Sequence, residues 1–381
     1  MYRLQDKKMP EIENNLGALR RKRGLSAIRL AATVGVSRQT IYAMEAGTYV
    51  PNTAVALRLA RALETTVEEV FTLPGAAPGA PPRSQQAVLL PGSAAPREGQ
   101  AVQLCQVENR LMAVAPSPVP WFFPIADAVA CGKPARQGKT RVRVFQEEAD
   151  FANRILVAGC DPGISVLSRH VQSAGNELVL AHRNSSQALS LLKEGRVHVA
   201  GTHLRDESSG ESNLPQIGRQ FPKNSVAVIA FAVWEEGILT ARGNPKGVRG
   251  IEDFSRQDVS IVNREKGSGS RALLDSRLRR ARIESRVVRG YDDLAPGHLP
   301  AAWQVQSGAA DCCLATRAVA QVFGLQFIPL VSERYDLVVW KQHLELPRIQ
   351  NLFDTLTRSN FRRELEGLGG YDTRTAGQRV L

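Results

Sequence analysis

From Arg154 to the C-terminus, short apolar runs alternate with amphipathic stretches. The runs RILVAGC, ELVLAH, VHVAGTH, VAVIAFAVW, VSIV, AADCCLA and LQFIPL have the length and composition of buried strands. Helical stretches such as ISVLSRHVQSA, SSQALSLLKEG and SRALLDSRLRRAR lie between several of them, and PRIQNLFDTLTRSNFRRELEGL predicts one long closing helix. This alternation predicts an α/β domain over residues 151–381 with mostly parallel sheets, in which ligands bind at the carboxyl ends of strands.

The rest of the chain divides at a segment rich in Pro, Gly and Ala, residues 74–97, which carries few large apolar groups and predicts a linker. Before it, residues 12–73 show five short helical patterns, with caps at Ser26 and Ser37 and Gly stops, which predict a small all-α domain. After it, residues 98–150 include a strand pair around Glu108-Asn109 and the alternating run TRVRVF. This part predicts a small β-rich connector.

Composition favours a cytoplasmic protein that binds a polyanion. The 381 residues carry a formal net charge of +12. The start of the chain has no apolar signal region, and no run is long and apolar enough to cross a membrane. The five cysteines show no CxxC spacing, so we expect neither a disulfide framework nor a metal site. The neighbours Cys312 and Cys313 lie in a strand pattern and are expected to face opposite sides of the sheet.

The stretch AATVGVSRQTIYAME has the layout of a helix-turn-helix: a helix, a turn at residues 34–36 and a second helix capped by Ser37. Six basic residues and no acid lie between Asn14 and Met44, where a nucleic acid would lie. A plain helical bundle with a solvated basic face is the alternative. We predict contacts with double-stranded DNA from side chains that can read bases or hold phosphates: Arg23, Ser37, Arg38, Gln39, Thr40 and Tyr42.

These residues resemble a known family of DNA-binding domains. Residues 12–71 are similar to the lambda-repressor/Cro-type (XRE) family through the strings LRRKRGLS, LAATVGVSRQTIYAMEAGTYVP and ALRLARALETTVEEVF. The resemblance implies that Ser37 to Tyr42 open the recognition helix. Ala27 stands where a Gln that reaches a phosphate is frequent in the family, which implies one contact fewer here. A homodimer is expected because one such head reads only a half-site.

The stretch NREKGSGSRALLD joins an apolar run to a helical run through two Gly-Ser pairs. Such a turn presents free N–H groups to an anion or polar solute. The letters GSGSRA also satisfy the dinucleotide pattern G-x-G-x-x-G/A, but four residues separate the strand from the first glycine, and no clear acid ends a second strand. We therefore predict that a small ligand is bound by Gly267, Ser268, Gly269, Ser270 and Arg271.

Three further strand ends carry hydroxyl and polar groups, in the strings GCDPGIS, HRNSSQ and AGTHLRD. Each serine alone could be an ordinary helix cap. Four such loops at one edge of an α/β domain instead predict a common crevice. The additional ligand residues predicted from these loops are Cys160, Asp161, Ser165, Ser185, Ser186, Thr202 and His203.

Residues 153–370 resemble the type II periplasmic-binding-protein superfamily, in particular the molybdate/tungstate-type domain found fused to helix-turn-helix units. The similar strings include LVAGCDPGISVL, LKEGRVHVAGTHL, VNREKGSGSRALLD and SGAADCCLATRAVA. The resemblance implies two lobes, the second at about 226–324, with a hinge near Tyr335-Asp336 and a ligand clamped between the lobes. Oxyanion binders of this superfamily use neutral hydroxyls and backbone N–H groups, and Cys160, His203 and Arg271 depart from that pattern.

The sequence therefore predicts an α + α/β multidomain chain that acts as a cytoplasmic, one-component DNA-binding transcription regulator. Its effector is expected to be a small anionic or polar solute, with molybdate or tungstate as the oxyanion that the resemblance implies. No HExxH, GxSxG or similar motif is present, so no catalytic residue, cofactor or membrane partner is expected. A dinucleotide-dependent enzyme that uses GSGSRA and a solute-binding receptor are the alternatives.

Overall fold

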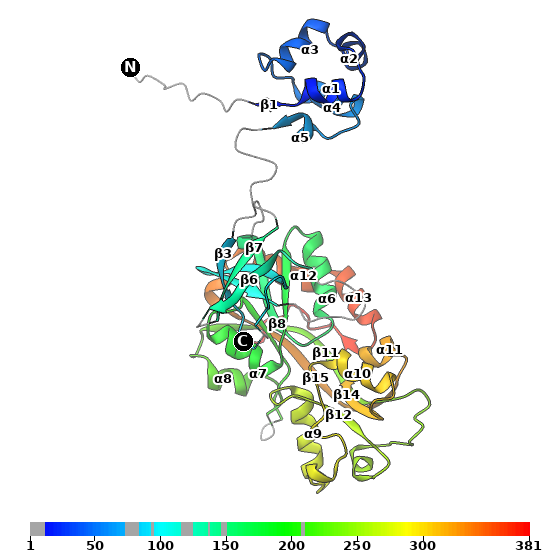
Figure 1. The fold of residues 1–381 in the computed structure, drawn as a ribbon. Coiled ribbons are helices and arrows are strands. Elements are labelled where there is room, and N and C mark those ends of the chain that lie inside the picture. The colour runs from blue at the N-terminus through cyan, green and yellow to red at the C-terminus, as the bar shows by residue number, and fades with distance from the viewer. Residues whose placement is uncertain are drawn as a thin grey trace. The chain divides into compact units, whose positions relative to one another are not determined.

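The computed structural model describes residues 12–72, 84–92, 95–115, 125–135, 138–145, 151–206 and 210–381. The chain forms two compact units, Met1–Pro81 and Pro82–Leu381, and each is described by itself. Figure 1 draws both.

The first unit is the expected helical domain. Its helices are α1 (Leu16–Lys22), α2 (Ala27–Val34), α3 (Arg38–Glu45), α4 (Thr53–Ala62) and α5 (Val67–Val70). The short strands β1 (Glu13–Asn14) and β2 (Phe71–Thr72) pair and bring the two ends of the domain together. The predicted caps at Ser26 and Ser37 are confirmed, because each side chain accepts a hydrogen bond from a first-turn N–H group. Asn52 caps α4 in the same way.

Helices of this length are not stable alone and depend on the apolar face that they share. Leu30 from α2, Ile41 from α3 and Leu59 from α4 are fully buried in one core. Gly35 adopts a left-handed conformation with φ of 74° and ends α2, as the sequence predicts. The turn after it orients α3 against α2.

The second unit begins with a closed β-barrel, in the strand order β3-β5-β4-β6-β7. The strands are β3 (Ser84–Leu89), β4 (Ala101–Val107), β5 (Arg110–Val114), β6 (Ala128–Ala135) and β7 (Lys139–Val144). The predicted hairpin around Glu108-Asn109 is confirmed. The prediction that the linker extends to residue 97 is wrong at β3, since the run QQAVL pairs with β7 and β5 and its Ala87 is buried. Residues 74–83, 93 and 94 of that predicted linker lie outside the described residues.

The α/β part is built on one sheet with the path β13-β12-β14-β11-β15-β10-β8-β9, and β16 (Tyr371–Asp372) pairs with β11. The strands of one half are β8 (Arg154–Gly159), β9 (Glu177–His182) and β10 (Val199–Thr202). Those of the other half are β12 (Ile261–Arg264), β13 (Leu294–Ala295) and β14 (Cys312–Thr316). Neighbours within each half are parallel, but β11 (Val226–Thr240) and β15 (Gln326–Trp340) run antiparallel to each other and to their neighbours. The expectation of mostly parallel sheets is therefore corrected to a mixed sheet.

Strands β11 and β15 pair along nearly their whole length and connect two lobes, as Figure 1 shows. Near one end of the pair β15 is bonded to β10, and near the other end β11 is bonded to β14, so the pair joins the two halves of the sheet. The cores are separate: Leu167, Val339 and Ile349 belong to lobe 1, whereas Phe254, Leu274 and Val305 belong to lobe 2. The pair is thus the two-strand hinge that the resemblance implies.

Helices cover both lobes. In lobe 1 they include α6 (Ile164–Ser173), α7 (Ser185–Lys193) and α8 (Leu214–Gln220), and in lobe 2 α9 (Gly269–Arg280), α10 (His298–Gln306) and α11 (Arg317–Phe323). Cys312 and Cys313 enter different lobe-2 clusters, which confirms that they face opposite sides of β14. No helix of the described residues is long and apolar enough to cross a membrane.

The predicted single closing helix is wrong. It is two helices, α12 (Pro347–Thr357) and α13 (Ser359–Gly367), because Arg358 is extended with ψ of 133°. Asn360 favours this break, since its side chain accepts a hydrogen bond from the N–H of Phe361. The bend allows both Leu356 and Phe361 to be buried in the lobe-1 core.

The barrel and lobe 1 share a core. Val107 and Met112 of the barrel lie in one buried cluster with Leu156 of β8. Arg154 links the two further, with its Nη1 atom 2.6 Å from a carboxylate oxygen of Asp127. The barrel is therefore a fixed part of lobe 1.

A buried histidine in lobe 1 makes the stability of this unit depend on pH. His198 accepts a hydrogen bond from the N–H of Leu156 at 3.0 Å through Nδ1. Burial, with Arg348 and His343 nearby, lowers its pKa to about 3. Because the unfolded chain keeps the ordinary value of 6.5, only that state gains the proton as the pH falls below 6.5. His198 should therefore cost up to about 2 kcal/mol of unfolding free energy between pH 6.5 and about pH 5.

The substitution His198→Asn tests this, because the amide oxygen can still accept from Leu156 without titrating. We expect the variant to lose about 2 kcal/mol less than the natural chain over that pH range. Urea unfolding followed by tryptophan fluorescence measures it, since all four tryptophans lie beyond residue 81. An equal pH dependence of both proteins would contradict the role of His198.

Candidate ligand site

The outer face of α3 is open. Ser37, Arg38, Gln39 and Tyr42 are exposed and Thr40 is half-buried, as expected for a helix that reads DNA. The guanidinium of Arg38 lies 5.2 Å from the centre of the Tyr42 ring, so the two side chains form one amphipathic patch.

Two of the basic residues near this face are engaged by acids. Arg20, one of the six basic residues counted between Asn14 and Met44, lies 2.6 Å from Glu45 and is largely buried, so it adds little to the basic surface. The predicted DNA contact Arg23 remains half-exposed and forms an ion pair of 2.7 Å with Glu64. The positive charge available to DNA is therefore smaller than the sequence count indicates.

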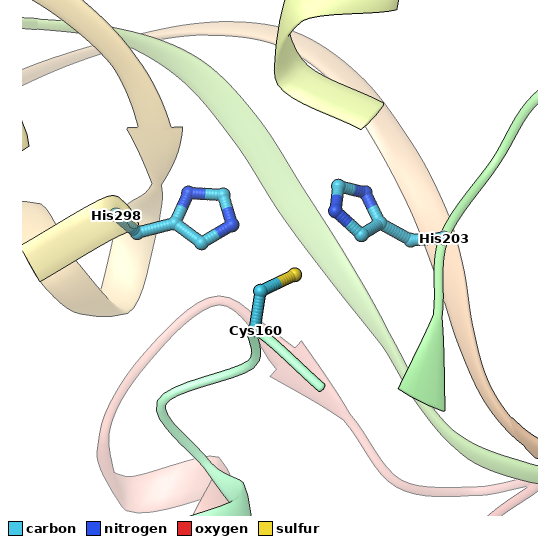
Figure 2. A group of neighbouring side chains, drawn as sticks. All are labelled: Cys160, His203 and His298. Atoms are coloured by element: carbon cyan, nitrogen blue, oxygen red, sulfur yellow. The ribbon is translucent and has the colours of Figure 1, made fainter. Parts of the chain in front are cut away.

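A second cluster of polar side chains lies where the lobes meet. Cys160 follows β8 and His203 follows β10 in lobe 1, while His298 begins α10 in lobe 2. Figure 2 shows the three side chains pointing into one common space. Their ligand atoms lie within 4.8 Å of one another, and so do those of His203, Glu236 and Glu333. All five side chains are at least 95% buried.

His203 is the centre of this cluster. Its Nδ1 atom lies 3.0 Å from Oε2 of Glu333, which leaves Nε2 directed at the common space. Burial alone would lower the pKa of His203, but Cys160 and Glu333 outweigh burial and raise it well above its usual range. His298 has the opposite shift: burial and the positive charge of Arg264 lower its pKa, so it is neutral. Burial and the neighbouring Glu333 raise the pKa of Glu236 to about 7.

Many polar atoms here have no hydrogen-bond partner within the protein, although native structures leave few buried polar atoms unpaired. Within the part of the chain that the structure describes, the unpaired atoms at this place are Asp161 Oδ2, His203 Nε2, Trp234 Nε1, both carboxylate oxygens of Glu236, Arg264 Nη1, Ser270 Oγ, and Nδ1 and Nε2 of His298. A concentration of unpaired buried polar atoms is typical of a site that holds a ligand, an ion or water.

Aromatic rings enclose the cluster. The ring centre of Trp234 lies 4.8 Å from that of His203 and 5.4 Å from that of His298. Tyr335 crosses the ends of β8 and β10, where its hydroxyl accepts a hydrogen bond from the N–H of Cys160. Glycine at 201 makes room for it, because an added Cβ would lie 2.1 Å from the Tyr335 hydroxyl. Trp234 and Tyr335 come from the hinge strands, so the hinge forms part of the site.

The Gly-Ser loop closes the cleft from lobe 2. A Cβ on Gly269 would lie 2.4 Å from both the ring and the carbonyl oxygen of His203, so α9 can approach lobe 1 only with glycine there. The carbonyls of Lys266 and Gly267 accept hydrogen bonds from Asn184 Nδ2 and from the Ser186 N–H. His203 fills the space that a dinucleotide pyrophosphate would need beside Gly269.

A glycine at the start of α10 also packs against a histidine of lobe 1. Gly297 precedes His298, has φ of 136°, and an added Cβ would lie 2.6 Å from Nε2 of His182 at the end of β9. Two lobe-2 helices therefore begin against histidines of lobe 1. Both contacts require the closed arrangement of the lobes.

The other predicted ligand residues have mixed placements. Ser185 and Thr202 are buried but engaged, since Ser185 Oγ accepts from the His203 N–H and Thr202 bonds to Asn213. Asp161 accepts a hydrogen bond from Tyr371 rather than pairing with His203. Ser165 is exposed and donates to a carbonyl in its own turn, outside the cluster.

In the Gly-Ser loop only Ser270 presents an unpaired side chain. Ser268 caps α9 by accepting from the Arg271 N–H, at a distance of 3.3 Å. Arg271 bonds to Asp275 and to the carbonyl of Arg264, and its guanidinium lies 4.0 Å from the centre of the Tyr291 ring. Its charge is therefore directed into lobe 2.

Sequence reasoning missed four residues of the cluster: Glu236, Arg264, His298 and Glu333. His298 could have been found, because it follows a strand and opens a helix as the other predicted residues do. The two glutamates lie within the hinge strands, beyond the runs predicted as strands. The signal for Glu236 was an acid inside a strand that the structure buries almost throughout. Glu333 offered no such signal, because the residues before it in β15 are exposed or half-buried.

Comparison with known proteins supports this organisation. A helix-turn-helix family model matches residues 16–70, and the model of the PBP superfamily domain matches residues 168–357. The chain is 32% identical over 240 residues to the uncharacterized protein YvgK of Bacillus subtilis (strain 168). The match covers 63% of this chain and 77% of YvgK. The chain belongs to the family of YvgK. It joins an XRE-type helix-turn-helix domain to a PBP-superfamily domain.

Two further proteins are similar to parts of the chain. The head is 42% identical over 62 residues to the uncharacterized HTH-type transcriptional regulator YgzD of B. subtilis, which covers 16% of this chain and 94% of YgzD. Among solved structures, the sulfate-binding protein SubI of Mycobacterium tuberculosis H37Rv has 16% identity and a TM-score of 0.44, and covers 57% of this chain and 86% of SubI.

The close approach at Gly269 predicts that Gly→Ala substitutions at two helical glycines, Gly269 and Gly218, have opposite effects on the stability of the second unit. Gly269→Ala should destabilise the second unit by about 1–3 kcal/mol, because the methyl group overlaps His203. Gly218→Ala, on α8 with nothing within 4 Å, should stabilise it slightly through helix propensity. Thermal unfolding followed by tryptophan fluorescence measures both, and a fall of at least about 2 °C is expected for Gly269→Ala only. A rise for both variants would mean that the lobes do not close at this contact.

Proposed function

We propose that this protein is a one-component transcription regulator that binds double-stranded DNA through α3 and responds to a small ligand enclosed between the lobes. The observation that carries the proposal is the combination of an open recognition helix with a buried cluster of unpaired polar atoms in one chain. Acting on DNA places the protein in the cytoplasm. We expect it to act as a homodimer, because one head spans only a half-site.

Docking of α3 in the major groove would bring Ser37 and Arg38 to the DNA first, since the N-terminal residues of a recognition helix lie nearest the base edges. Arg38 can donate two hydrogen bonds to a guanine or contact a phosphate, and Gln39 can pair with an adenine. Thr40 and Tyr42 complete the surface, and Arg23 is proposed to reach the backbone by exchanging Glu64 for a phosphate.

The cleft supports a ligand that is small and polar or ionic, because the unpaired atoms include both donors and acceptors. A molybdate or tungstate ion is one candidate, favoured by the free donors of Arg264 and Ser270. The carboxylates of Glu236 and Glu333 oppose it, because they would repel an anion in a buried site. We therefore consider an oxyanion less favoured at this site than a ligand without negative charge.

The DNA-reading surface predicts a selective loss of affinity. Arg38→Ala and Gln39→Ala should each weaken binding to a selected operator by about 1–3 kcal/mol, because each removes a contact to base edges. An operator is first selected from random duplexes with the full chain, and binding is then measured by fluorescence anisotropy at one fixed salt concentration.

The matched control is Lys223→Ala, which removes a positive charge from an exposed site in lobe 1. It should leave operator affinity within about 0.5 kcal/mol of the natural chain. The α3 assignment fails if Lys223→Ala weakens binding as much as Arg38→Ala does.

A dimeric regulator also predicts the layout of the operator. Two heads related by a twofold axis require two inverted half-sites with centres about 10–10.5 base pairs apart, or a multiple of that spacing. Footprinting of the selected operator measures the spacing, and a mid-site insertion of about 5 base pairs should abolish high affinity. A single unrepeated site with full affinity would contradict the dimer.

A further inference from the structure

We propose that the cluster between the lobes is a binding site for a divalent transition-metal ion of the Zn²⁺ type, held by Cys160 Sγ, His203 Nε2 and His298, with Glu236 beside them. The inference rests on the proposed function, in which this ion would be the enclosed effector. It replaces the expectation from the sequence that the chain holds no metal site.

The set of donor atoms carries the first part of the argument. Thiolate sulfur and imidazole nitrogen together are the ligands that select Zn²⁺ and other late first-row metals over Mg²⁺ or Ca²⁺. Three such atoms from Cys160, His203 and His298 lie within 4.8 Å of one another, and each residue is at most 2% exposed. In a tetrahedral zinc site two ligand atoms lie roughly 3.3–3.7 Å apart, so only small side-chain movements are needed.

The short separations of these ligand atoms fit a single ion better than an oxyanion placed between them. Two hydrogen bonds on opposite sides of an oxyanion, each about 2.8 Å long, already exceed the 4.8 Å that bounds these atoms, before the width of the anion is added. A single metal ion at about 2.0–2.3 Å from each ligand fits.

Charge supports the same ligand. Glu236 and Glu333 are both buried beside these ligand atoms, and a metal-bound Cys160 would add a thiolate. A divalent cation is attracted by these groups, whereas an anion would be repelled by them. Charges buried in a protein are ordinarily paired or bound to metals.

Glu333 adds a detail that is common in metal sites. Histidines that bind metals usually donate their other ring N–H group to a carboxylate, which fixes the tautomer and directs the free nitrogen at the ion. His203 has this arrangement, with Nδ1 at 3.0 Å from Glu333. Glu333 is therefore a positioning residue for His203.

The test is a titration of the full chain with Co²⁺, which reports tetrahedral geometry and thiolate ligation by visible absorption. The protein is first made metal-free with a chelator and kept reduced with a phosphine. We expect intense tetrahedral bands and a thiolate-to-cobalt band that saturate at one ion per chain and disappear when Zn²⁺ is added. Absence of these bands, with thermal stabilisation by molybdate or sulfate instead, would overturn the metal assignment.

The variants identify the ligands. Cys160→Ser should remove the thiolate band and weaken Co²⁺ binding at least about 100-fold, whereas Glu333→Gln should weaken it about 10–100-fold and keep the band. The control is Cys131→Ser, because Cys131 in the barrel is the more exposed thiol and the more accessible to an adventitious ion. A band that survives in Cys160→Ser but is lost in Cys131→Ser would refute the site.

Two further measurements keep the outcomes separate. His298→Gln preserves Cys160, so it should weaken binding even if Cys160→Ser fails to fold, and circular dichroism checks the fold of each variant. Operator affinity is then measured with and without Zn²⁺. If one ion binds as expected but operator affinity is unchanged, the metal site stands and the ligand response fails. If the α3 variants bind DNA normally, the DNA-reading role fails independently of the metal.

Discussion

The pairing of β11 with β15 is the constraint on which the rest of this domain depends. Each strand is continuous across both lobes, so the two halves of the sheet cannot separate without breaking ladder hydrogen bonds. Register shifts occur on β11 between Ala230 and Ala232 and between Glu236 and Gly237, next to the residues that face the cluster. Bulges bend a strand and redirect its side chains, so the hinge also sets the positions of Trp234 and Glu236.

Glycine defines how closely the lobes approach. Gly269 and Gly297 begin the two lobe-2 helices that contact His203 and His182, and neither position has room for a Cβ. The Gly-Ser loop thus has a steric role that its pattern did not reveal. The sequence predicted that the loop binds an anion, whereas in the structure it allows the N-terminus of α9 to lie against the imidazole of His203. Dinucleotide binding is disfavoured for the same reason, because protein atoms occupy the space beside the loop.

Local patterns were sufficient to predict the elements but not their long-range partners. Apolar runs located β8, β9 and β14, and Ser26 and Ser37 located two helix starts, because these signals depend on near neighbours. The strand ends correctly grouped Cys160 with His203. The acids of the hinge, Glu236 and Glu333, were missed because the predicted strands ended before them, at Trp234 and at Leu330. Only pairing across the sheet shows the two acids to be buried. The barrel strand at 84–89 was missed because its partners lie up to 59 residues away, as Ser84 and Arg143 do.

The residues of the cluster come from both lobes, so the proposed regulator has two states, with the lobes open or closed. Cys160 and His203 belong to lobe 1, His298 to lobe 2 and Glu236 to the hinge, so the full set of ligands exists only when the lobes are closed. Closure without a ligand leaves buried polar atoms unpaired, which costs about 1–3 kcal/mol for each uncharged group. A ligand that binds only the closed form shifts the equilibrium by RT ln(1 + [L]/Kd), about 2.7 kcal/mol at a hundred times Kd. The barrel shares its core with lobe 1. A shift toward the closed form therefore moves lobe 2 relative to lobe 1 and the barrel together.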